Sequence, residues 1–203
     1  MVVGLYLSNS TEAVLGSRGG CDHGSMTATN PDMVAALPEV AREVEDFVAG
    51  GGWDQPPQLF ALVPTAELLA AEPGMAAQLD AAAPLTPIAQ EPLAEPELDV
   101  ALAGIAWPDG VAGCAVVQEI VVLPPEVESA LSDDAAGAPA MLTRLAATHP
   151  SRREARLVAA VLRDGPGACL LRLRGGDDAL EELVEHPDLA PNLIEALRGT
   201  FEP

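Results

Sequence analysis

The chain has 203 residues and carries 31 acidic residues against 10 basic ones, for a formal charge of −21 at pH 7. A negative charge of this size repels nucleic acid phosphates and anionic lipids, so it disfavours binding to DNA, RNA or membranes. A protein partner, preferably a basic one, or self-association remains compatible with it. The basic residues are all arginine, which excludes chemistry that requires a lysine amine. The three cysteines lie far apart, and this odd count without a recognisable leader predicts reduced thiols in the cytoplasm.

Residues 1–31 contain many Gly, Ser, Thr and Asn residues and few periodic apolar ones, so we predict a flexible N-terminal tail. The Cys21-Asp22-His23 cluster within it offers too few ligands for a metal site, and we expect neither a metal nor another cofactor in this protein. The remaining residues, 32–203, are predicted to form a single α+β domain, because a chain of this length can bury a substantial core.

The first half of this domain alternates between helical and extended patterns. Apolar residues spaced three and four apart predict a helix from Asp32 to the glycine run at 50–52. An uninterrupted apolar run and a threonine cap follow, and several prolines then interrupt the chain. These patterns predict a strand at 59–63, helices at 65–71 and 75–82, a short edge strand at 86–90 and a helix at 97–105.

The stretch from Trp107 to Pro125 contains the longest turn-bounded apolar run, and we predict that it forms the central strand of the sheet. Nearly all of its residues suit a strand that is covered on both faces, but Gln118 and Glu119 do not. Burying an unpaired amide costs about 1 to 3 kcal/mol, and a lone carboxylate costs more. Either an arginine on an adjacent strand pairs with Glu119, or one face is open as a groove or a dimer surface. We expect the arginine pairing.

The last third contains a predicted hairpin whose Asp-Gly-Pro-Gly turn joins strands at 155–163 and 168–174. If the turn has an even length, the two-residue period of a strand places Arg163, Arg172 and Arg174 on one face. The neighbouring patterns predict a helix at 139–147, an acidic helix over 177–185 and a final helix capped by Asp188.

The predicted arginine face is the leading candidate for a binding surface. Three guanidinium groups on one face can grip carboxylates or phosphates through paired hydrogen bonds. The competing interpretation is that these arginines pair with the chain's own acidic residues, which outnumber the basic ones 31 to 10. The numbers favour this internal pairing.

The sequence contains no motif of a known chemistry, such as a nucleophile elbow, a dinucleotide-binding loop, a phosphate loop or a zinc-binding helix. Cys114 and Cys169 fall in predicted strands, where a buried cysteine usually behaves as a small hydrophobe. Neither His149 nor His186 can be placed beside them to activate a thiol. We therefore predict no catalytic residue.

Three stretches of the sequence stand out together: Gly52-Trp53-Asp54-Gln55-Pro56-Pro57-Gln58-Leu59-Phe60-Ala61-Leu62-Val63, Ile105-Ala106-Trp107-Pro108-Asp109 through Gly113-Cys114-Ala115, and Arg156-Leu157-Val158 through Leu171-Arg172-Leu173-Arg174. They resemble an uncharacterised family of actinobacterial cytoplasmic proteins, and the resemblance extends over roughly residues 33 to 203. It implies an α+β domain and brings no functional residues with it.

The order of elements predicts an antiparallel sheet of four to five strands with helices packed mainly on one face. On fold alone, this order and the acidity are similar to small secretion-chaperone-like domains, which dimerise and bind partner segments. We therefore expect a non-catalytic binding or adaptor protein. The alternative is a small enzyme with a pocket near Trp53, Trp107 and the hairpin arginines. A pocket with convergent polar groups would favour the enzyme, and a broad apolar patch on the sheet would favour the adaptor.

Overall fold

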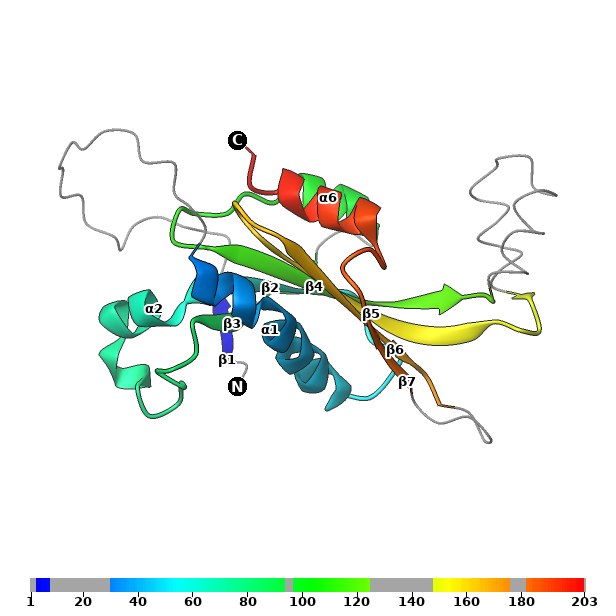
Figure 1. The fold of residues 1–203 in the computed structure, drawn as a ribbon, viewed down its shortest axis with the longest axis horizontal. Helices are drawn as coiled ribbons and strands as arrows, with labels where there is room; N and C mark the ends of the chain where they lie inside the picture. The colour runs from blue at the N-terminus through cyan, green and yellow to red at the C-terminus, as the bar shows by residue number, and fades with distance from the viewer. Residues whose placement is uncertain (1–2, 8–29, 94–96, 125–147, 176–181, 203) are drawn as a thin grey trace.

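The computed structural model describes residues 3–7, 30–93, 97–124, 148–175 and 182–202. Within them, a single open sheet contains seven strands in the order β1-β3-β2-β4-β5-β6-β7 (Figure 1). Neighbouring strands are antiparallel except β1 and β3, which run parallel. The α+β class is confirmed, but the sheet is larger than the expected four to five strands. The strands are β1 (Val3–Leu7), β2 (Gln58–Pro64), β3 (Leu85–Gln90), β4 (Gly113–Val122), β5 (Arg153–Leu162), β6 (Gly167–Leu173) and β7 (Glu182–Glu185).

Helices cover both faces of the sheet, so the expectation that they pack mainly on one face is wrong. Helix α1 (Pro31–Ala49) packs on β5 and β6, whereas α6 (Pro191–Gly199) packs on β5 from the opposite face beside α3 (Leu98–Ala103) (Figure 1). Val158 and Ala160 belong to the apolar cluster of α1, and Ala159 and Val161 belong to that of α6. Because β5 is apolar on both faces, each face requires its own helix.

Short helices and termini differ most from the predictions. Helix α2 (Thr65–Ala71) forms as expected, but the helix predicted at 75–82 is replaced by the 3-10 turn η1 (Pro73–Met75) and irregular turns. The hydrogen bond from the Ala76 N–H to the Pro73 carbonyl joins residues three apart, as in a 3-10 helix, and not four apart as in an α-helix. Helix α6 begins at Pro191 without a side-chain cap, so Asp188 does not cap it. The helix predicted at 139–147 lies outside the described residues.

The acidic stretch predicted as a helix over 177–185 contains strand β7 at its described end. Leu183 pairs with Arg172 of β6, and Val184 pairs with Leu171. The edge of β6 offers unpaired backbone groups, and satisfying them outweighs the weak helix preference of a short acidic segment.

The segment Val3–Leu7, within the predicted tail, forms β1 and pairs in parallel with β3. The strand predicted at 86–90 is therefore present as β3, but it lies between β1 and β2 and is not an edge. The rest of the predicted tail lies outside the described residues up to Asn30. The Asn30 side chain accepts a hydrogen bond from Asp32 N–H (2.9 Å) and so caps α1.

Strand β4 is central along its first half only. Gly113–Val117 is buried between β2 and β5, as the sequence predicted. The pairing of β2 with β4 ends where Gln58 meets Val117, so from Gln118 onward β4 pairs with β5 alone. The segment Gln118–Val122 together with its partner residues Arg153–Leu157 is called the arm below; β6 still pairs with Ala155–Leu157 on the other side of β5, and the arm extends past the helices in Figure 1.

Candidate functional site

Glu119 lies at the base of the arm, directly opposite Arg156 on β5. Its Oε1 is 3.3 Å from an Arg156 guanidinium nitrogen, so the expected pairing with an arginine on an adjacent strand is confirmed. The carboxylate also accepts hydrogen bonds from the backbone N–H groups of Asp54 (2.8 Å) and Gln55 (3.4 Å). Glu119 therefore fastens the loop between α1 and β2 to the arm.

Arg156 lies at the centre of a network of charged side chains, which we call the network below. Its own side chain is only 1% exposed. It contacts Glu45 of α1 at 3.3 Å, and it also donates to the Gly52 carbonyl. Glu45 is equally buried and accepts a second charge-assisted bond from Arg172 of β6 (2.5 Å). The carboxylate is thus held between two guanidinium groups, an arrangement that offsets the cost of burying charge.

Arg156 and Glu45 belong to the site, although the sequence patterns do not single them out. Arg156 falls within a predicted strand, and Glu45 lies on the predicted helix away from its apolar stripe. The signal that could have found Arg156 is its isolation: it is the single charged residue in the run from Ala155 to Leu162. A lone charge inside a buried strand requires a partner of opposite sign.

Trp53 covers the network. Its ring lies 4.6 Å from the Arg156 guanidinium carbon and 5.3 Å from that of Arg174, both within cation–π range. Arg174 also bonds to Glu154 (2.5 Å) and Asp54 (3.3 Å). Arg172 and Arg174 are therefore engaged by the chain's own acidic residues, which confirms the internal-pairing interpretation for these two arginines.

Arg163 does not join Arg172 and Arg174, so the predicted arginine face is wrong. The Leu162 N–H donates to the Pro166 carbonyl (3.2 Å), which gives the turn an odd length instead of the assumed even one. A one-residue change of register moves side chains to the opposite face. Arg163 instead bonds to the Pro108 carbonyl (2.8 Å) and lies 4.6 Å from the centre of the Phe201 ring.

The two tryptophans are not brought together into one pocket. Trp53 lies over the network on the α1 side, whereas Trp107 packs against the C-terminal segment on the α6 side. Trp107 Nε1 donates to the Thr200 hydroxyl (2.8 Å), and its ring stacks on Phe201. Trp107 and Arg163 together fix the chain's C-terminal segment to the loop before β4.

Cys114 and Cys169 are free and buried, as expected for structural residues. The expectation that no histidine lies beside them is wrong for Cys169, because the His186 N–H donates to the Cys169 carbonyl (3.3 Å) and both residues line one cavity. Burial raises the pKa of the Cys114 thiol to about 12. Burial also raises the pKa of Cys169. The nucleophilic thiolate is therefore scarce at neutral pH for both residues.

Replacing Glu119 with Gln should lower the free energy of unfolding by about 1 to 2 kcal/mol, since the bonds that Glu119 accepts lose their charge assistance. Urea denaturation at pH 7 measures this loss. Glu154→Gln, which weakens an exposed pair with Arg174, is the control and should cost well under about 1 kcal/mol. An unchanged stability for Glu119→Gln would contradict the anchoring role.

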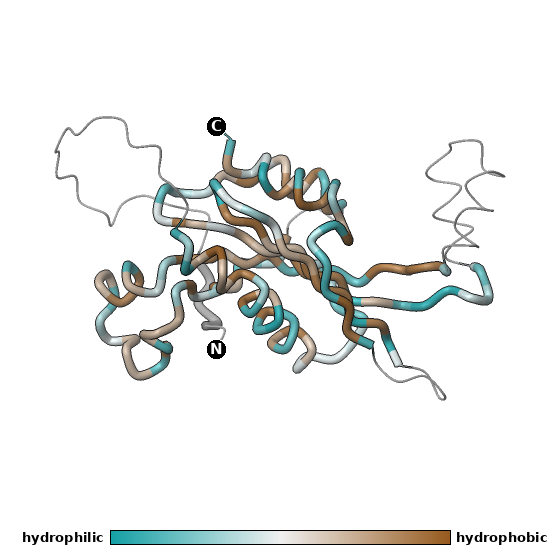
Figure 2. Tube along the Cα trace, viewed as in Figure 1, coloured by the Kyte–Doolittle hydropathy of each residue, from teal (hydrophilic) through white to brown (hydrophobic). Residues whose placement is uncertain are grey.

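The α6 side of the arm carries an apolar surface that continues across four strands. We call it the outer strip. No apolar cluster formed by the described helices includes its members. Leu157 is buried among them, and Figure 2 shows the outer end of β4 as strongly hydrophobic. The partly exposed side chains that form the strip are Ile120 and Val122 of β4, Leu171 and Leu173 of β6 and Val184 of β7.

Gln118 is half-buried at the inner end of the outer strip. The amide lies where β4 loses β2 as a neighbour, so one side of the strand is open there. Arginine pairing therefore explains Glu119, whereas Gln118 lies beside the strand edge that β4 presents beyond β2.

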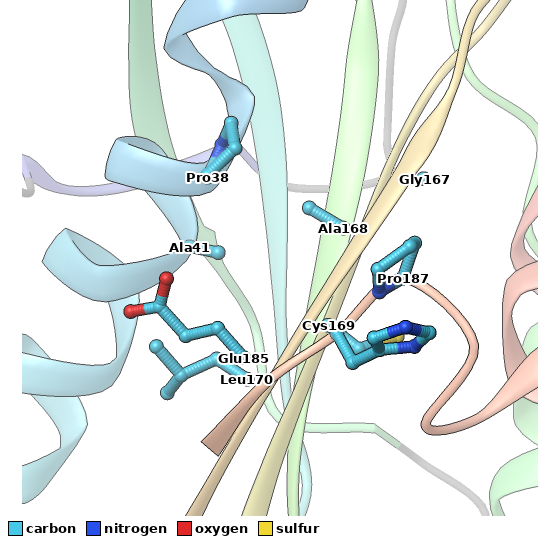
Figure 3. A pocket seen from close by; sticks show the side chains of 9 residues that line it. Pro38, Ala41, Gly167, Ala168, Cys169, Leu170, Glu185 and Pro187 are labelled. Atoms are coloured by element: carbon cyan, nitrogen blue, oxygen red, sulfur yellow. The ribbon is translucent and has the colours of Figure 1, made fainter. Parts of the chain in front are cut away.

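A cavity of about 290 Å³ opens at the edge of the sheet, where β7 ends and the chain turns toward α6. We call this cavity the edge notch. Figure 3 shows α1 on one side of it and the segment that follows β7 on the other. Its walls and floor include Pro38 and Ala41 of α1, Gly167 and Ala168 of β6, and Glu185 and Pro187.

These features define an α+β protein with an open, mainly antiparallel sheet, an internal network of charges and an apolar strip on the arm. The chain belongs to the family of PPA1309-like proteins, whose family model matches residues 37–202. This family is consistent with the resemblance seen in the sequence, and it covers nearly the same residues. No curated protein and no solved structure matches the chain.

Two further findings concern the described part of the chain. None of its helices has the length and apolar character needed to cross a bilayer. Within the described residues, no group of three or more His, Cys, Asp or Glu side chains is placed to hold a metal ion.

Proposed function

We propose that this protein is a non-catalytic adaptor that binds a protein partner through the outer strip. The observation that carries this proposal is the continuity of the strip: Ile120 and Val122 adjoin Leu171 and Leu173 across β5, with Val184 beyond them. A contiguous, partly exposed apolar patch on a folded protein is typical of a binding surface. A broad patch of this kind is the feature that favours the adaptor over the enzyme.

The charge of the chain indicates the chemistry of the partner. With a net charge of −21, the protein attracts basic segments and accelerates their encounter. Exposed Glu182 lies at the rim of the strip, beside Leu173 in the register. We therefore propose a partner segment that is apolar on one side and basic along its border. The buried free thiols are compatible with a role in the cytoplasm.

The enzyme alternative has less support. The hairpin arginines that it requires are bonded to Glu45, Glu154 or backbone carbonyls, and the two tryptophans lie on opposite sides of the sheet. Guanidinium N–H donors that are already used inside the protein are not available to a substrate unless those bonds break. The network is better explained as the support of the arm.

The double substitution Ile120→Gln/Val122→Gln tests this proposal. Both residues lie on the strip face, and two amides there should abolish association with a partner while costing about 1 kcal/mol of stability. The measurement is quantitative mass spectrometry of proteins cross-linked to the tagged chain in its native host. A basic protein that is cross-linked to the wild-type chain should be absent from the sample of the double variant.

Val121→Gln is the matched control, since Val121 is exposed on the opposite face of the same strand. It should retain the captured protein. Equal capture by both variants, or no enrichment over untagged cells, would overturn the proposal. A sizing measurement tests whether the strip instead binds a second copy of the chain. If the wild type is a dimer that Ile120→Gln/Val122→Gln dissociates, the partner is another copy of the chain and the proposed basic partner is refuted.

A further inference from the structure

Strand β6 is longer than its neighbour β7, so part of β6 forms an open edge of the sheet. β7 pairs with Leu170–Leu173, and the last ladder bond runs from the His186 N–H to the Cys169 carbonyl (3.3 Å). Pro187 follows directly. Since proline has no N–H and its ring restricts the chain, the ladder cannot continue past it. Among the described residues, no strand pairs with the outer side of Gly167.

The backbone of Gly167 faces this open edge. In an antiparallel ladder, alternate residues direct both their N–H and their C=O groups toward the same neighbour. The Cys169 carbonyl faces β7, so Gly167, two residues earlier, directs its polar groups to the same side. Unpaired groups of this kind are a template for an added strand. The floor of the edge notch therefore contains one backbone donor and one acceptor.

The walls of the notch combine apolar surface with a carboxylate. Pro38 and Ala41 of α1 face Pro187 across it (Figure 3). Glu185 accepts bonds from Arg42 Nε and from a terminal Arg42 nitrogen, each at 2.5 Å. These bonds lower the pKa of Glu185, which is therefore ionised at neutral pH. Because a carboxylate has about four lone-pair positions, each oxygen retains room for a further donor.

We propose that the edge notch binds an extended, lysine-containing peptide segment. The peptide backbone adds to β6 at Gly167, and the lysine stem lies between Pro38 and Pro187 with its ammonium group at Glu185. Apolar walls that end at a carboxylate match this side chain, and the chain's charge of −21 attracts it. The notch lies at the edge of the sheet rather than on its face, so this proposal is independent of the outer strip.

Titration of the ¹⁵N-labelled full chain with the peptide acetyl-Val-Lys-Val-amide, followed by NMR, tests the proposal. The Gly167 amide signal should shift and saturate, and its hydrogen exchange should slow as the added strand pairs with it. Glu185→Gln should weaken binding about fivefold. The same peptide with norleucine in place of lysine should bind the wild type and Glu185→Gln equally and more weakly.

Glu182→Gln is the control, because Glu182 is an exposed acid on the same strand and does not line the notch. It should leave the affinity for the lysine peptide within about twofold. An unmoved Gly167 signal at millimolar peptide, or equal weakening by both substitutions, would overturn the proposal. Ile120→Gln/Val122→Gln should not change this titration, so a failure at the outer strip and a failure at the notch can be told apart.

Discussion

Replacing Arg156 with Met should lower the free energy of unfolding by about 3 kcal/mol. Methionine fills most of the space of the arginine stem, so the loss reflects charge more than an empty cavity. Glu45, whose side chain is 1% exposed, would keep Arg172 but lose its fully buried partner. Glu119 and the Gly52 carbonyl would each lose a donor as well. Urea denaturation followed by circular dichroism at pH 7 measures the change.

Arg174→Met is the matched control for Arg156→Met. Arg174 also lies over the Trp53 ring and bonds to acidic residues, but its side chain is 34% exposed. An exposed pair contributes little, so the control should cost less than about 1 kcal/mol. The double variant Glu45→Leu/Arg156→Met should cost less than the sum of its single substitutions, since an apolar pair requires no compensation. Equal costs for Arg156→Met and Arg174→Met would show that burial adds nothing to this network.

The network and the outer strip occupy opposite faces of the same arm. Glu119 and Arg156 point toward α1, whereas the next residues along β4 and β5, Ile120 and Leu157, point away from it. The arm lacks β2 as a neighbour beyond Val117, so the β4 side of it has no further strand to stabilise it. The ion pairs fix the base of the arm to α1 and to the loop that carries Trp53. The charged residues thereby support the apolar surface that we propose as the binding site.

Much of the fold was predictable where local patterns and burial agree. The period of apolar residues located α1, and the long apolar run located the inner half of β4. The cost of burying a lone carboxylate correctly predicted an arginine partner for Glu119. The helices on both faces were also implicit in the sequence, since β5 is apolar at consecutive positions from Leu157 to Leu162.

The remaining features depend on tertiary structure that no local pattern specifies. The length of one turn decides whether Arg163 shares a face with Arg172, and several lengths are compatible with its glycines and proline. β7 forms because β6 presents an open edge, which its own composition does not reveal. Glu45 meets Arg156 only after α1 docks on the sheet. The pairing of Glu45 with Arg156 was therefore beyond prediction from the sequence.

Replacing Gly113 with Ala should lower the free energy of unfolding by about 2 to 3 kcal/mol. Gly113 begins β4 and lies between Leu62 of β2 and Leu162 of β5. A methyl group there would lie 2.4 Å from the Val161 carbonyl oxygen, which belongs to the backbone and cannot rotate away. Relief of this clash requires β4 and β5 to separate where both strands are buried. Thermal and urea denaturation of the two proteins measure the loss.

Gly110→Ala provides the comparison, because a methyl group at Gly110 would meet nothing within 4 Å. It should leave the stability within about 0.5 kcal/mol or raise it slightly, since alanine restricts the unfolded chain. A Gly113→Ala protein as stable as Gly110→Ala would mean that the central strands are not packed as closely as the structure shows. A large loss confined to Gly113→Ala would instead establish that the β4–β5 contact tolerates no added side chain, which explains why a glycine begins the central strand.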